Sequence, residues 1–143
     1  TFTAVKLTDQ YGINVCAHII LGIPGETWDD MMQTATVISK LPVNGVKIHH
    51  LHVIKDTPLE RLYSNGGIKL LTLREYISIL CDFIERLRPG ITIHRLAGDR
   101  SDDTLVAPRW GLHKGTVLQS VEDEFIKRCT YQGFLYQLDG EML

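Results

Sequence analysis

The stretch NVCAHIILGIPGETWDD, residues 14–30, decides the fold. Its first half, residues 14–21, is almost entirely apolar and rich in branched side chains, which is typical of a strand covered on both faces in a parallel sheet. Glycine and proline in residues 22–25 break the strand, and Thr27 has the properties of a helix N-cap. Acidic residues follow it, where the helix dipole favours them. The stretch therefore predicts a strand, a tight loop and a helix.

The same alternation continues along the whole chain. Helices are predicted at residues 2–11, from 28 to Leu41, at 59–63, from Thr72 to Pro89 and at 114–129; further strands are predicted at 46–54 and 91–96. Strands that alternate with helices form right-handed βαβ units and a mostly parallel sheet. Three strands make a thin sheet, so we expect residues 1–143 to be one domain and part of a larger barrel or open sheet. The isolated piece is expected to self-associate through its exposed sheet edge.

The composition indicates the class of protein but does not identify its function. The 143 residues are 44% hydrophobic and 22% charged, as in a soluble globular protein. The net charge of −2 gives no general attraction to nucleic acid, but it does not exclude a local basic patch. No apolar run approaches the roughly 20 residues of a membrane span, and no signal peptide opens the chain. The cysteines Cys16, Cys81 and Cys129 are far apart, which argues against disulfides and favours the cytoplasm. Each lies in an apolar pattern, so each is predicted to be buried.

Ligands of parallel α/β folds meet the loops after the carboxyl ends of the strands. The first such loop, residues 22–27, has two glycines that allow close backbone approach, and the helix start at Thr27 offers amides to a polar or anionic ligand. A tight turn before a well-capped helix explains the same residues equally well. The sequence leaves both interpretations open.

Two further groups of polar residues follow the later strands. His50 and His52 alternate with His49, so the first two are expected on one face; with no third ligand evident, metal binding, hydrogen bonding to a ligand and simple packing all remain open. Arg95, next to His94, could hold a carboxylate or phosphate through two hydrogen bonds. The charged loop that follows, which ends at Arg109, could equally be solvated and held by structural ion pairs.

One segment carries a resemblance to a known family. HIILGIPGET, residues 18–27, resembles the fifth-strand segment of radical S-adenosylmethionine (radical SAM) enzymes, as in oxygen-independent coproporphyrinogen oxidases and Elp3-like proteins. Residues 41–59, 94–99 and 105–110 are similar to the YhcC-like group of bacterial radical SAM proteins. The likeness to this group extends over nearly the whole chain, and these segments are its most specific parts.

The resemblance implies a fold and a chemistry. The fold would be α/β, with parallel βα units forming the C-terminal part of a partial TIM-like barrel. The parent would be an Fe–S oxidoreductase that uses a [4Fe–4S] cluster and SAM to generate a 5′-deoxyadenosyl radical. The CxxxCxxC triad of the cluster would lie in the N-terminal part of the same polypeptide. The fragment itself is therefore expected to be inactive, to bind neither cofactor and to hold no metal.

The resemblance also implies roles for single residues. Gly22, Pro24, Gly25 and Glu26 would face the adenosine part of SAM, and Lys47 and His49 are weaker candidates for the same pocket. His94, Arg95 and Asp99 are candidates for the substrate side. Catalytic residues are not assigned, the substrate is unknown, and RNA is suggested only by analogy with Elp3-type proteins. The alternative is a non-catalytic α/β module that binds a nucleotide or a protein partner.

Overall fold

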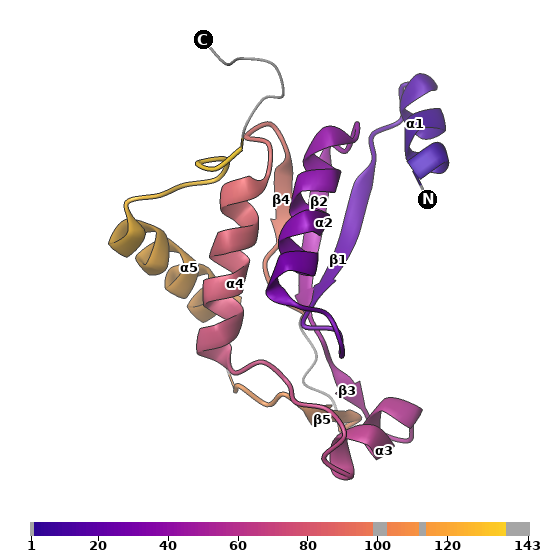
Figure 1. Ribbon diagram of the computed structural model, residues 1–143, viewed down its shortest axis with the longest axis vertical. Coiled ribbons are helices and arrows are strands. Elements are labelled where there is room, and N and C mark those ends of the chain that lie inside the picture. Colours follow the sequence, from indigo (N-terminus) through magenta and orange to yellow (C-terminus); the bar gives the residue numbers. More distant parts are fainter. Residues whose placement is uncertain (1, 99–102, 112–113, 137–143) are drawn as a thin grey trace.

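The computed structural model describes residues 2–98, 103–111 and 114–136 (Figure 1). Its elements are, in chain order, α1 (Phe2–Gln10), β1 (Cys16–Leu21), α2 (Trp28–Lys40), β2 (Gly45–His50), β3 (Val53–Ile54), α3 (Pro58–Ser64), α4 (Leu73–Arg86), β4 (Thr92–Arg95), β5 (Leu105–Ala107) and α5 (Lys114–Arg128).

The main sheet is parallel, as the sequence predicted. Its strand order is β1-β2-β4, and both neighbouring pairs are parallel. Helices α2 and α4 lie side by side over one face of this sheet, and α5 packs on the outer side of α4 (Figure 1). This arrangement confirms the expected parallel βα units of an α/β fold.

Two capping boxes fix where the main helices begin. At the start of α2 the backbone amide of Thr27 donates to the Asp30 carboxylate at 2.8 Å, and the Asp30 amide donates to the Thr27 hydroxyl at 3.2 Å. Thr72 and Glu75 make the same reciprocal pair at the start of α4, at 2.7 and 3.2 Å. These side chains satisfy amides that a helix start leaves unpaired, so the boundaries are set locally.

The hydrophobic core lies between the sheet and the two covering helices. Apolar side chains from the middle of β2 and from the inner face of α4 are almost completely inaccessible to solvent: Val46, Ile48, Leu80, Phe83 and Ile84. Alternation along β2 sends Val46 and Ile48 toward the helices, while Lys47 and His49 point to the other side. Burial of this apolar area is the main force that holds the sheet and helices together.

The other face of the sheet is open in the part of the chain that the structure describes. Along β1, Cys16, His18 and Ile20 are exposed while the residues between them are partly or fully buried. The expectation that this strand is covered on both faces is therefore wrong for the described residues, because helices cover only one side. Cys81 is buried as predicted, but the prediction is wrong for Cys16 and Cys129, which are exposed.

The predicted strand 46–54 is in fact two strands. β2 ends at His50, and β3 pairs antiparallel with β5 in a separate small sheet. The Lys55 amide donates to the Thr104 carbonyl at 2.8 Å, which extends this pairing. Leu51 and His52 carry the chain beyond the carboxyl end of β2, so Val53 and Ile54 lie outside the ladder of the main sheet and pair with β5 instead. The small sheet and α3 lie together at the end of the molecule where β2 ends (Figure 1).

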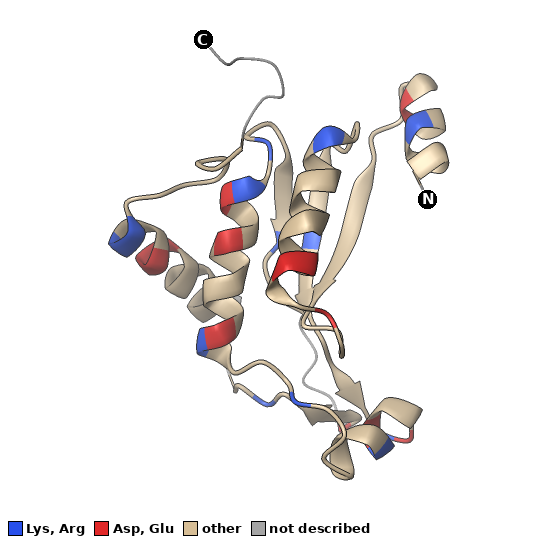
Figure 2. Ribbon diagram, viewed as in Figure 1, with Lys and Arg blue, Asp and Glu red and all other residues tan. Residues whose placement is uncertain are grey.

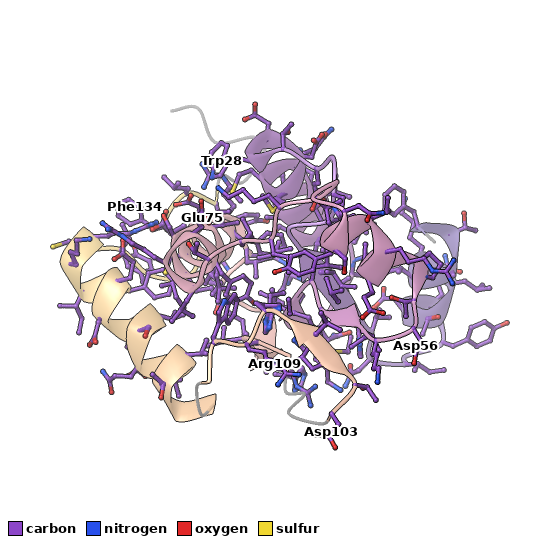
Figure 3. The ribbon with its side chains drawn as sticks, turned by 90° about the horizontal axis from the view of Figure 1, so that it is seen from below. Trp28, Asp56, Glu75, Asp103, Arg109 and Phe134 are labelled. Atoms are coloured by element: carbon purple, nitrogen blue, oxygen red, sulfur yellow. The ribbon has the colours of Figure 1, made fainter. Side chains whose placement is uncertain are left out.

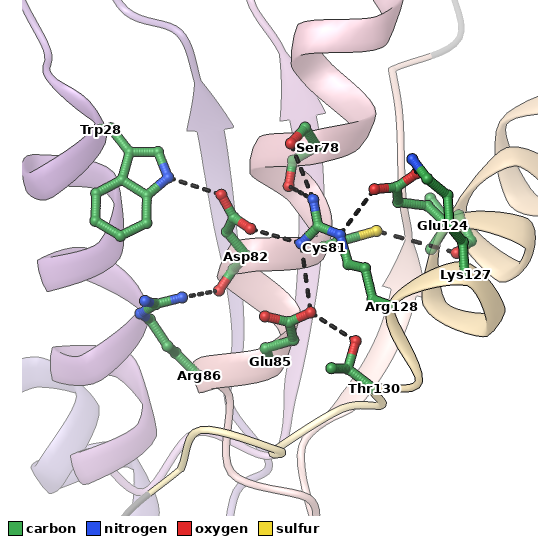
Figure 4. Close-up of polar contacts among 11 residues, drawn as sticks. Trp28, Ser78, Cys81, Asp82, Glu85, Arg86, Glu124, Lys127, Arg128 and Thr130 are labelled. Atoms are coloured by element: carbon green, nitrogen blue, oxygen red, sulfur yellow. Dashed lines mark hydrogen bonds and ion pairs between the residues drawn. The ribbon is translucent and has the colours of Figure 1, made fainter.

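A network of charges joins α5 to α4 (Figure 4). The Arg128 guanidinium contacts the carboxylates of Asp82 at 2.6 Å, Glu85 at 3.3 Å and Glu124 at 2.8 Å. The Trp28 indole of α2 donates to Asp82 at 2.7 Å, so the network also reaches the second covering helix. Charges of both signs along α4 and α5 are visible in Figure 2.

Candidate functional site

The uncovered side of the main sheet gathers most of the polar residues that sequence reasoning selected. We call it the open face and define it by Cys16, His18, Ile20, Lys47, His49, His94 and Arg95. Strict alternation would put the consecutive His94 and Arg95 on opposite faces, but the β2–β4 ladder has a register shift between Val46 and Lys47. The His94 ring lies over Gly45 and the charge of Arg95 acts on His49, so we assign both to this face. In the ladder, Lys47 is paired with His18 on one side and with Arg95 on the other. These three side chains therefore form a row across three neighbouring strands, which are about 4.8 Å apart in parallel sheets.

Two glycines let imidazole rings lie close to the strands of the open face. A Cβ atom on Gly45 would stand 2.5 Å from Nε2 of His94, so that ring lies directly over the β2 backbone. A Cβ atom on Gly98 would stand 2.7 Å from the His52 ring and 3.4 Å from Nδ1 of His49. The distances of 2.5 and 2.7 Å are too short for a real Cβ atom, so any other residue at Gly45 or Gly98 would force the neighbouring imidazole ring to move.

The surroundings of His49 show that the open face is electrically positive. Its ring stacks on that of His18, with ring centroids 6.0 Å apart. Partial burial lowers the pKa of His49, and the positive charge of Arg95 and the neighbouring His18 lower it further. The lowered pKa keeps His49 neutral at pH 7, with one ring nitrogen that donates a hydrogen bond and one that accepts.

The loop between β1 and α2 has the sharp backbone that its glycines predicted. Gly22 has φ +82° and Gly25 has φ +86°, and the Glu26 amide donates to the Ile23 carbonyl at 3.0 Å. Gly22 is tightly packed, since a Cβ atom there would stand 2.8 Å from Leu71, whereas a Cβ atom on Gly25 would meet nothing within 4 Å. Pro24 is exposed beside Gly25. The loop therefore has a buried half and a half that is open to a ligand.

Glu26 has an unusual position in this loop. Its Oε2 atom is buried and has no hydrogen-bond partner among the described residues. Burial raises the pKa of the carboxyl group, and the negative charge of Asp30 adds to this effect. A buried carboxyl oxygen without a partner is costly, so this atom is suited to accept a hydrogen bond from a ligand.

The start of α2 is a poor site for an anion. The amide of Asp30 is already used by the Thr27 hydroxyl in the capping box, and Asp29 and Asp30 place two acidic side chains in the first turn. Negative charge at this end would repel an anionic ligand. This acidic helix start disfavours the interpretation that the loop binds an anion. The features that remain for ligand binding are the shape of the loop and its apolar neighbours.

His50 and His52 contact each other, as their expected common face predicted. Their Nε2 atoms are 2.7 Å apart, and the His50 ring also lies 4.1 Å from Trp110 and 5.3 Å from Tyr76, between ring centroids. Desolvation by burial lowers the pKa of His50 to about 3, helped by the charges of His52 and His49. Nδ1 of His50 is buried and has no hydrogen-bond partner in the described part of the chain. His50 also lines a small pocket together with Gly22 and Trp110.

Two of the three residues predicted for the substrate side lie in the described part of the chain. His94 and Arg95 are exposed on the open face, and Asp99 lies outside the described residues. Arg109 has a structural role, because its guanidinium donates to the Leu105 carbonyl at 2.6 Å. Arg109 and Asp103 are both exposed, and Figure 3 labels both in the lower half of its view.

The described residues offer no obvious cluster or metal site. Among them, no group of three or more His, Cys, Asp or Glu side chains is arranged to hold a metal ion. Burial raises the pKa of the Cys81 thiol to about 12, and its Sγ atom donates to the Val121 carbonyl at 4.0 Å. Over the same residues, no helix has the length and apolar character needed to cross a membrane.

Sequence reasoning missed His18 as a member of the site, because the strand was expected to be buried on both sides. The signal was a lone titratable residue inside an apolar run, two residues from the exposed Cys16 and Ile20. The aromatic contacts of Trp110 were also missed, since they join residues that are 60 positions apart, His50 and Trp110.

A parallel βα sheet with one polar, uncovered face and a glycine loop at its carboxyl end is the geometry of a segment of an α/β enzyme barrel. The model of the family described as Radical_SAM C-terminal domain matches residues 43–127. The chain belongs to this family, and so to the radical SAM superfamily, as the resemblance implied.

Relatives and a solved structure agree with the assignment. The chain is similar to uncharacterized protein MJ0486 of Methanocaldococcus jannaschii, with 42% identity over 91% of this chain and 41% of that protein, and to protein YhcC of Escherichia coli, with 28% identity over 90% and 41%. It thus spans about two fifths of their length. Elp3 of the archaeon Methanocaldococcus infernus superposes with a TM-score of 0.79 and 19% identity, over 92% of this chain and 31% of that one, which shows a common fold. The expected part of a TIM-like barrel is consistent with this match.

Proposed function

We propose that this chain is the C-terminal part of a radical SAM Fe–S oxidoreductase and that its open face and β1–α2 loop form one wall of the cavity for SAM and substrate. The main support is the open face itself, which carries polar side chains on a parallel sheet that helices cover on one side only. In a barrel of parallel strands, helices cover the outer side and the inner side faces the other strands. The open face is then the inner side of the parent barrel.

The loop and its neighbours fit the adenosine part of SAM. Ile20 and Ile23 are each 44% exposed, which leaves apolar surface for a planar ring beside the open space at Gly25. The partnerless Oε2 of Glu26 is an acceptor for the hydroxyl or amino groups of a nucleoside. Together with a [4Fe–4S] cluster, bound SAM supplies a carbon-centred radical that abstracts hydrogen. The task of these residues would be to orient the nucleoside and to exclude water.

The cysteines of this chain do not fit the cluster. Such clusters need converging thiolates, whereas Cys81 is buried with a raised thiol pKa and Cys16 and Cys129 lie on separate exposed elements. We therefore assign the cluster to an N-terminal part of the parent polypeptide. That part would also pair with the outer edge of β1, which is the first strand of the sheet.

The test uses the parent polypeptide, reconstituted with iron and sulfide under anaerobic conditions. With dithionite and SAM it should form 5′-deoxyadenosine. Gly25→Val should weaken SAM binding about 10-fold, since it fills the open half of the loop, and should leave the cluster absorbance unchanged. Gly66→Val is the matched control, because Gly66 also has positive φ and open space around it but lies outside the site.

Two results would contradict the proposal. A parent without a cysteine triad would exclude the radical chemistry outright. A cluster-loaded parent that binds SAM and forms no 5′-deoxyadenosine would favour the alternative of a non-catalytic nucleotide-binding module.

A further inference from the structure

The open face carries positive charge that no carboxylate of the described residues neutralises. Among the residues that the structure describes, neither Lys47 nor Arg95 forms an ion pair or a hydrogen bond with a carboxylate. They are nevertheless paired across neighbouring strands, where like charges destabilise a sheet. Such an arrangement is expected where a ligand supplies the missing negative charge.

The groups around these two cations are hydrogen-bond donors, and none of them is a carboxylate. His18 is paired with Lys47 in the ladder, His49 is two residues further along β2, and the His94 ring lies over Gly45. An imidazole ring offers at least one N–H donor in either protonation state. A lysine, an arginine and several imidazoles on one rigid sheet form a set of donors that matches an oxyanion.

Within residues 2–98, 103–111 and 114–136, the acidic residues of the β1–α2 region lie away from this row. Glu26, Asp29 and Asp30 belong to the β1–α2 loop and the first turn of α2. An anionic ligand is thus repelled from the loop and attracted to the row His18, Lys47 and Arg95. That row is two residues from Ile20 along β1, which corresponds to about 6.6 Å.

We propose that the row His18, Lys47 and Arg95, flanked by His49 and His94, binds a phosphate or carboxylate group of a small-molecule substrate. The inference rests on the proposed function, since it names the substrate class for the same cavity. The substrate anion binds in the middle of the open face, and the adenosine of SAM binds at its loop end. The two ligands therefore occupy different parts of one wall.

The experiment measures equilibrium binding to the reconstituted parent protein without reductant, by calorimetry at constant ionic strength. Inorganic pyrophosphate and citrate are the probes, because they distinguish a phosphate from a carboxylate ligand. At least one of them should bind, and Lys47→Met and Arg95→Gln should each weaken that probe about 10- to 100-fold, the cost of one charge-assisted hydrogen bond. Lys127→Met is the matched control: it removes the same charge from the exposed end of α5 and should bind as the wild type does.

Five outcomes would overturn the inference. The first three are that neither probe binds, that both variants bind as tightly as the wild type, and that Lys127→Met loses as much affinity as they do. The fourth is that saturating SAM displaces the probe, in which case the row belongs to the carboxylate of SAM. A single-stranded RNA that binds through Lys47 far more tightly than either probe would also replace a small molecule with nucleic acid.

The result is independent of the radical chemistry. A parent that binds the probe through Lys47 and Arg95 but forms no 5′-deoxyadenosine refutes the proposed function alone. A parent that forms 5′-deoxyadenosine but binds neither probe refutes this inference alone.

Discussion

The two sides of the main sheet differ in whether their basic side chains have carboxylate partners. On the side of the helices, Arg128 is surrounded by Asp82, Glu85 and Glu124, and each contact is short. On the open face, Lys47 and Arg95 are neighbours in the ladder and have no acidic partner among the described residues. Both sides carry basic residues, but in the described part of the chain only those on the helix side are paired with carboxylates.

The difference separates stability from binding. Charges that are paired inside the chain hold helices together, and removing one partner leaves the others uncompensated. Like charges that remain unpaired lower the free energy of unfolding, and a ligand that binds them in the folded state raises it again. The paired side should therefore be sensitive in unfolding experiments, and the open face should be sensitive in binding experiments.

Arg128→Met should give the largest loss of stability. It leaves Asp82 and Glu85 without the cation that they share, and the Glu85 side chain is only 7% exposed. We expect the free energy of unfolding to fall by about 3 kcal/mol, as for the loss of one partner of a buried ion pair. Urea unfolding followed by circular dichroism measures the change. Lys127→Met, which breaks an exposed pair on the same helix, should cost less than about 0.5 kcal/mol. Equal losses would mean that the network does not hold α5.

His50 should make stability depend on pH. Its pKa is about 3 in the folded protein, against 6.5 for a free histidine, so between these values the unfolded state binds a proton that the folded state does not. Stability should therefore fall as pH decreases below about 6.5, by up to about 1.4 kcal/mol per pH unit. Urea unfolding between pH 7 and pH 5 measures the slope.

The matched variant for this slope is His50→Phe, which keeps an aromatic ring against Trp110 and Tyr76. It should unfold with a smaller dependence on pH than the wild type. Carboxyl groups with lowered pKa, such as those of Asp30 and Glu75, act in the same direction but at lower pH. Identical slopes for the two proteins would show that His50 does not stay neutral.

The loop glycines should differ in their importance for stability and for binding. Gly22→Ala combines a strained positive φ with a Cβ atom 2.8 Å from Leu71, so we expect a loss of about 2 kcal/mol. In Gly25→Ala the added Cβ atom has open space around it, so the free energy of unfolding should fall only by the strain of the positive φ, about 1 kcal/mol. Thermal unfolding of the two variants tests this order. The reverse order would place the ligand-accessible half of the loop at Gly22 instead.

Sequence patterns predicted the parts of the fold that are encoded locally. The capping boxes at Thr27 and Thr72 and the apolar runs of β1 and β2 are each contained in a few consecutive residues. The small sheet was missed because Val53–Ile54 and Leu105–Ala107 are short, and only their distant pairing defines them. The single open face was also missed, because the number of layers that cover a strand depends on the whole chain. Among the site residues, the glycine loop follows from spacing, whereas the row with His18 depends on the register of three strands.

Lys47→Met should have the smallest effect on stability, and its sign is the informative part. Because Lys47 is paired with the positively charged Arg95, removing it should leave the free energy of unfolding unchanged or raise it by about 0.5 kcal/mol at low salt. The gain should disappear at 1 M salt, where screening acts within about 3 Å. Arg95→Gln should behave in the same way, since it removes the other member of the pair. Urea unfolding at both salt concentrations measures these changes. If either variant is instead destabilised by more than about 1 kcal/mol, its charge has a partner within the protein, and the open face has no need of an anion.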